Sequence, residues 1–91
     1  MKEQLKKLNR IKRLAATILM ARKILWEDRR NFNTNQTNSD AIKRAMEETG
    51  LNSISMQVIQ KLMAEKDVYS RASLILSQNH PKIALELTRS G

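Results

Sequence analysis

The chain has 91 residues, a formal net charge of +8, no cysteine, two glycines and one proline. This composition excludes disulfide frameworks and thiolate metal sites, and it has too few turn residues for a typical β-sheet protein. The length suits one domain or one protomer of an oligomer, and the core of so short a chain is small, which leaves dimerisation open. The three aromatic residues are too few for the stacking platforms that bind single-stranded nucleic acids.

Residues 2–30 contain no glycine or proline, and good helix formers dominate them. Their apolar residues recur mostly at steps of three or four, which predicts one long basic amphipathic helix over residues 1–30. Ten Lys/Arg and three Asp/Glu give these 30 residues a charge of +7, whereas residues 31–91 carry only +1. Lys6, Arg10 and Arg13 share one stripe of the helix with Lys2. This stripe is either a solvated face or a surface that contacts nucleic-acid phosphates.

The second half of this helix is apolar on all sides, because nine of the twelve residues 15–26 are apolar. A helix of this kind is buried on more than one side. Ile11, Ile18 and Leu25 also lie seven residues apart, which is typical of a short heptad-like seam. We therefore expect a central helix that packs on the rest of the chain and, through the seam, on a second copy in a homodimer.

Residues 31–38 are polar and rich in asparagine, which favours an exposed linker. Residues 39–91 predict a small bundle of short helices. Ser39 is the expected N-cap of a helix that ends at Thr49, and Gly50 is its expected left-handed terminator. The expected caps of the later helices are Ser53 or Ser55, Ser70, and Asn79 or His80 ahead of Pro81. The predicted fold is all-α, a long N-terminal helix followed by three or four short helices in a small bundle.

No constellation of catalytic residues is recognisable. His80 is the only histidine, and the consecutive acids Glu47 and Glu48 point about 100° apart on a helix, so neither indicates acid–base or metal chemistry. Both glycines stand alone, which excludes a glycine-rich phosphate loop. The apolar run LAATILMA is shorter than the roughly 18 residues of a membrane span. We expect a cytoplasmic protein that is not an enzyme, with no catalytic residue, cofactor, metal or membrane contact.

Residues 42–63 have the spacing of two helices that pack across a short turn. Met46 lies four residues before Gly50, Leu51 follows the glycine, and Met56 and Ile59 lie six and nine residues beyond it. The segment GLNSISMQVIQ resembles the turn and recognition helix of lac-repressor-type and phage-repressor-type helix-turn-helix proteins. Two departures are Met46, where that family usually has alanine, and Val58, at a position that is often polar. The same spacing also suits two core helices joined by a glycine turn.

The resemblance implies a second helix that lies in the major groove of DNA. The residues facing the groove would then be Asn52, Ser53, Ser55, Gln57, Gln60 and Lys61. Since this segment has little charge, phosphate contacts would come largely from Lys6, Arg10 and Arg13.

Two functional hypotheses follow from the sequence. The first is a small dimeric transcriptional or replication regulator that binds double-stranded DNA. The alternative is a helical adaptor, inhibitor or chaperone whose basic N-terminal helix binds an acidic protein. The first requires the helix-turn-helix residues and the basic stripe to serve one surface.

Overall fold

The computed structural model describes residues 2–30 and 37–89 of the chain. These residues form six helices and no strand, so the all-α prediction is confirmed. The helices are α1 (Lys2–Lys6), α2 (Arg10–Arg30), α3 (Asn38–Thr49), α4 (Met56–Met63), α5 (Val68–Asn79) and α6 (Pro81–Thr88).

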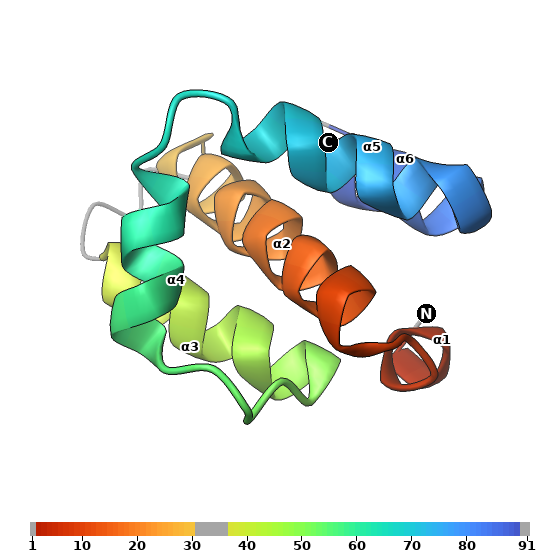
Figure 1. Ribbon diagram of the computed structural model, residues 1–91. Helices are drawn as coiled ribbons and strands as arrows, with labels where there is room; N and C mark the ends of the chain where they lie inside the picture. Colours follow the sequence, from red (N-terminus) through yellow and green to blue (C-terminus); the bar gives the residue numbers. More distant parts are fainter. Residues whose placement is uncertain (1, 31–36, 90–91) are drawn as a thin grey trace.

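The longest helix, α2, lies at the centre of the bundle (Figure 1). It packs on α3 on one side and on α5 and α6 on the other, while α5 and α6 form an adjoining pair. The short helix α4 packs on α3 and touches α5, and α1 lies against α3 and the start of α2. The expected central helix is therefore present, and it is covered by elements from the C-terminal two thirds of the chain.

The apolar stretch of α2 supplies much of the core. Its buried residues are no more than 8% exposed: Ala15, Ala16, Ile18, Leu19, Ala21 and Leu25. Because alanine allows two helix backbones to approach closely, the alanines of α2 and α3 suit a tight contact between these helices. Of the heptad-like seam, Ile18 and Leu25 are buried within the chain, whereas Ile11 is 64% exposed.

The helix predicted over residues 1–30 is interrupted between Lys6 and Arg10. Asn9 causes the interruption, since its side-chain oxygen accepts a hydrogen bond from the backbone N–H of Lys12 at 2.9 Å and so caps α2. The guanidinium of Arg13 donates to the backbone carbonyls of Lys6 and Leu8, which completes the end of α1. These contacts turn α1 away from α2 and towards α3.

The predicted helix boundaries are partly correct. Gly50 terminates α3 with a φ of 71°, and Ser55 caps α4, both as expected. Ser39 was the wrong cap for α3, because Thr37 accepts the hydrogen bond from Asp40 N–H and α3 begins at Asn38. Ser70 was also wrong, since α5 already begins at Val68 after Asp67. His80 precedes Pro81 at the start of α6. Of the linker predicted over residues 31–38, residues 31–36 lie outside the described residues, whereas Thr37 and Asn38 cap and begin α3.

Two buried hydroxyls join α2 to α3. Thr17 and Thr49 are both fully buried, and their Oγ1 atoms lie 2.7 Å apart. The hydroxyls also lie within hydrogen-bond distance of backbone carbonyls one turn earlier, those of Arg13 and Ala45. This arrangement satisfies both polar groups inside the core and sets the last turn of α3 beside the second turn of α2.

Candidate nucleic-acid interface

Helices α3 and α4 form the unit that resembles a helix-turn-helix. Figure 1 shows α4 crossing α3 rather than running parallel to it. Ile42, Ala45, Leu51 and Ile59 are no more than 4% exposed, and Met46 and Met56 are partly buried against the same core. The packing positions of the motif therefore all point inward or towards the helix contact.

The connection between the two helices is longer than in a tight helix-turn-helix. Six residues, 50–55, separate Thr49 from Met56, compared with the usual three or four. Leu51 N–H donates to the carbonyl of Met46 at 3.1 Å, which closes the end of α3 after the left-handed Gly50. Leu51 then turns into the core, and the remaining residues lead to the cap at Ser55.

Five of the six predicted groove-facing residues are exposed, namely Asn52, Ser53, Ser55, Gln57 and Lys61. Asn52 and Ser53 belong to the connection, and Gln57 and Lys61 lie one turn apart on α4. Val58, beside Gln57, is 46% exposed. The outer face of α4 thus presents an amide, an ammonium group and a branched apolar side chain.

Two of the six predicted residues of this unit make intramolecular hydrogen bonds. The hydroxyl of Ser55 is exposed but accepts from Val58 N–H at 3.4 Å as the α4 cap. Gln60 is partly buried, and its amide donates to the hydroxyl of Ser39 at 2.8 Å. Gln60 therefore ties α4 to the first turn of α3.

The predicted basic stripe also contains both exposed residues and one residue that makes intramolecular hydrogen bonds. Lys6 and Arg10 are exposed. Arg13 is partly buried, and its guanidinium is occupied by the carbonyls that end α1. Of Lys6, Arg10 and Arg13, therefore, Lys6 and Arg10 are available to a polyanion.

The predicted residues are spread along α3, and the connection with Asn52 lies at the end of α3 nearest α1. Gln60 of α4 contacts Ser39 in the first turn of α3. Thr17 of α2 contacts Thr49 in the last turn of α3. Thr17 lies one turn after Arg13, which holds the end of α1. The 12 residues of α3 span about 18 Å, roughly five base-pair steps of 3.4 Å.

An additional cation lies close to the connection. Lys43 of α3 is exposed and lines an open hollow together with Glu47, Gly50 and Asn52. The sequence places Lys43 on the first helix of the motif, but only the folded connection brings it beside Asn52. Glu47 on the same wall opposes part of its charge.

Neither a metal site nor a membrane span is found in the described part of the chain. Residues 2–30 and 37–89 contain no group of three His, Asp or Glu side chains that could hold a metal ion. None of the described helices is long and apolar enough to cross a membrane.

The fold and surface define a small all-helical protein with an exposed polar face on α4. In comparisons with known proteins, the chain matches no family model, no curated protein and no solved structure. Its function is therefore inferred from the geometry and charge of its own residues.

Proposed function

We propose that the protein binds double-stranded DNA through the α3–α4 unit and acts as a transcriptional or replication regulator. One observation carries this proposal: the packing positions Ile42, Ala45, Leu51 and Ile59 are buried, while the polar residues between them face solvent. The unit therefore has an inner face that fixes α4 on α3 and an outer face that is free for a ligand.

The exposed side chains have suitable chemistry for DNA. The amide of Gln57 can pair with an adenine edge and the ammonium group of Lys61 with guanine, while Val58 offers an apolar contact for a thymine methyl. Asn52 and Ser53, in the connection between α3 and α4, can donate to phosphate oxygens. Lys6 ends α1, which packs on α3, and Arg10 begins α2; both exposed cations can supply charge for phosphate.

Dimerisation is part of this proposal. Because Ile18 and Leu25 are buried in the core, a second copy would contact the exposed start of α2, around Ile11. Two copies would double the number of phosphate contacts, which matters for a unit with so few local cations.

The test is a fluorescence anisotropy titration of a labelled random duplex at low and at physiological salt. The double variant Lys6→Ala/Arg10→Ala is expected to weaken binding to all sequences. If both cations contact phosphate, the slope of log affinity against log salt becomes shallower by about 2, since each contact contributes roughly 0.9. The double variant Gln57→Ala/Lys61→Ala is expected to remove sequence preference, measured against selected sites.

The matched control is Arg89→Ala, which removes one exposed cation at the C-terminal end of α6. This end lies beside Lys23 of α2, whose ammonium group donates to the Glu86 carbonyl, and so lies away from Lys6 and Arg10. The control should reduce affinity only by the general effect of net charge. DNA binding that is insensitive to salt, or an equal loss in Arg89→Ala and Lys6→Ala, would contradict the proposal.

A second candidate function is the binding of an acidic amphipathic helix from another protein. It is favoured by an apolar groove between α2 and α5 that is lined by the 64% exposed Ile11 and by Leu14, Leu62 and Ile75. Arg10 precedes Ile11 in α2 and could pair with an acidic flank. The variant Ile75→Ser, at the α5 wall of this groove, keeps the net charge and leaves Ile11 in place for a second copy. It should abolish protein binding in this case and leave DNA affinity unchanged.

A further inference from the structure

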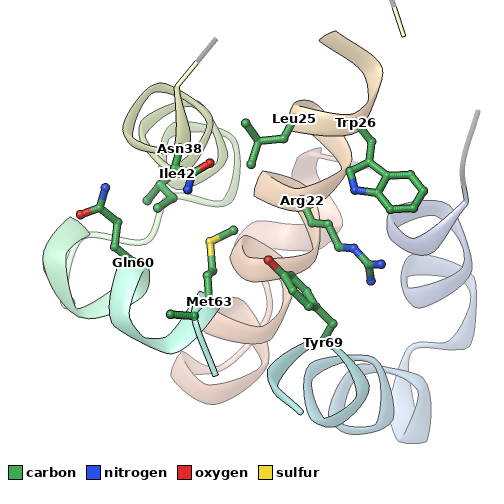
Figure 2. A pocket seen from close by; sticks show the side chains of 9 residues that line it. Arg22, Leu25, Trp26, Asn38, Ile42, Gln60, Met63 and Tyr69 are labelled. Carbon is green, nitrogen blue, oxygen red and sulfur yellow. The ribbon is translucent and has the colours of Figure 1, made fainter. Parts of the chain in front are cut away.

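A cavity of about 340 Å³ lies where α2, α3, α4 and α5 meet. Figure 2 shows the side chains around it. Its apolar lining comes from Leu25, Trp26, Ile42, Met63 and Ala64, and its polar lining from Arg22, Asn38, Gln60 and Tyr69. Polar groups take somewhat more of its lining than apolar ones. A concave site with a few convergent polar groups suits a small molecule, and this volume falls at the lower end of the range for such sites.

Arg22 is held in place by two aromatic rings. The guanidinium carbon lies 4.5 Å from the ring centroid of Tyr69 and 5.0 Å from that of Trp26. Contact with ring faces fixes the position of the guanidinium, and its N–H groups remain free to donate. Among the side chains that the structure describes, no carboxylate forms an ion pair with Arg22. The cavity therefore has a positioned cation at its edge without a described counter-ion.

Tyr69 contributes a hydroxyl to the cavity. Its ring rises from α5, and its oxygen points into the space between Met63 and Arg22 (Figure 2). Burial raises the pKa of Tyr69, and the positive charge of Arg22 only partly offsets this rise. The hydroxyl is therefore protonated at neutral pH and can donate a hydrogen bond.

We propose that this cavity binds a small organic anion, a carboxylate attached to an aromatic or compact apolar group. The carboxylate would accept hydrogen bonds from Arg22 and from the Tyr69 hydroxyl, and the apolar group would contact Leu25, Trp26 and Met63. This site is separate from the proposed DNA surface, and its test needs no DNA.

The charge of the protein selects the sign of the ligand. A cationic ligand would be repelled by Arg22 and by the net charge of +8. A neutral ligand of the same shape would keep the apolar contacts and lose the charge-assisted hydrogen bonds, which are the stronger interactions at such a site. Preference for an anion over its neutral analogue is therefore the distinguishing property.

Trp26 is the only tryptophan in the chain, so its fluorescence reports directly on this cavity. The probes are phenylacetate, phenylacetamide and phenethylamine, which share one ring and differ in charge. Phenylacetate should change the fluorescence of the full chain along a saturable curve, and calorimetry should give the same affinity. Phenylacetamide should bind at least about tenfold more weakly than phenylacetate, and phenethylamine should not bind.

Three variants locate the site. Arg22→Gln should weaken phenylacetate binding by about tenfold or more and remove the preference over phenylacetamide. Tyr69→Phe should weaken it by several-fold, as expected for one lost neutral hydrogen bond. Ala64→Leu, which adds volume at the cavity wall without changing charge, should prevent binding of every probe. Lys82→Gln, an exposed cation on α6, is the control and should bind phenylacetate normally.

Circular dichroism of each variant shows whether the helices are retained, so that loss of binding is not confused with unfolding. A folded Ala64→Leu protein that still binds phenylacetate would overturn the proposal. So would equal affinity for phenylacetate and phenylacetamide in the unmodified chain, or absence of saturable binding to it.

Discussion

The contact between α2 and α3 differs in kind from the attachment of α4. Between α2 and α3 the structure buries small residues and a pair of threonine hydroxyls, so the two helices are joined by close packing and by a satisfied polar contact. In α4 only Ile59 is fully buried, with Met56, Leu62 and Met63 partly covered. The first contact supplies the scaffold, and the second leaves one face of α4 available for binding.

The difference suggests that α4 is the more easily displaced element. A short helix with a single fully buried side chain has little apolar area to lose on opening. Its hydrogen bond from Gln60 to Ser39 and its cap at Ser55 then contribute a larger share of its attachment. Three substitutions test this comparison.

The largest effect is expected from Ile59→Ala. Ile59 is 0% exposed, and truncation of a buried isoleucine costs about 2–5 kcal/mol through lost transfer energy and the cavity that remains. Chemical denaturation measures the loss of unfolding free energy, and amide hydrogen exchange should show faster exchange in α4 than in α2. Equal acceleration in both helices would contradict a selectively loosened α4.

A smaller loss is expected from Thr49→Val, which keeps the shape of the side chain and removes its hydroxyl. Thr17 would then lose its buried partner across the helix contact, at a cost of about 1–3 kcal/mol. The double variant Thr17→Val/Thr49→Val should recover part of this loss, because no buried hydroxyl remains there. If the double variant loses more unfolding free energy than the two single variants lose together, the two threonines do not stabilise the helix contact as a pair.

The smallest effect is expected from Ser55→Ala, which removes the α4 cap. The hydrogen bond from Val58 N–H to the serine oxygen is long, at 3.4 Å, so the loss should fall near the lower end of the range for N-caps, about 0.5–1 kcal/mol. Asn9→Ala, at the better-formed α2 cap of 2.9 Å, is the matched comparison and should cost more. Thermal unfolding of both variants under one condition measures the difference.

Several local features were predictable because their causes lie within a few residues. Gly50 ends α3 because glycine readily adopts a positive φ. Pro81 begins α6 because proline lacks a backbone N–H, and the first helical position has no intrahelical partner for one. The apolar stretch at residues 15–26 indicated a helix covered on more than one side, and its neighbours are now identified as α3, α5 and α6. The all-α fold followed from the same periodicities.

The break at Asn9 was not predicted, since residues 2–30 contain neither glycine nor proline and asparagine alone is a weak signal. It depends on Arg13, which closes α1 once the chain has turned, and on the burial of Leu5 and Leu8. Likewise, the helical period placed Lys6, Arg10 and Arg13 on one stripe and could not distinguish their roles. Only the folded structure shows that Arg13 donates to a backbone carbonyl of the same chain.

The cavity beside Arg22 shows the limit of sequence reasoning more clearly. Arg22 and Trp26 are four residues apart and share a helix face, but Tyr69 and Met63 reach the same place only through the path of the chain over α3. No local spacing connects these residues. Their grouping depends on contacts between four helices.

The all-α class, the helix ends at Gly50, Ser55 and Pro81, and the asymmetry of charge follow from the chain alone, because each arises from neighbouring residues or from composition. The folded arrangement determines which polar residues stay exposed, since burial depends on what packs over a residue from elsewhere in the chain. For that reason Lys61 and Gln57 remain candidates for DNA, whereas Gln60 secures α4 and Arg22 stands beside a cavity.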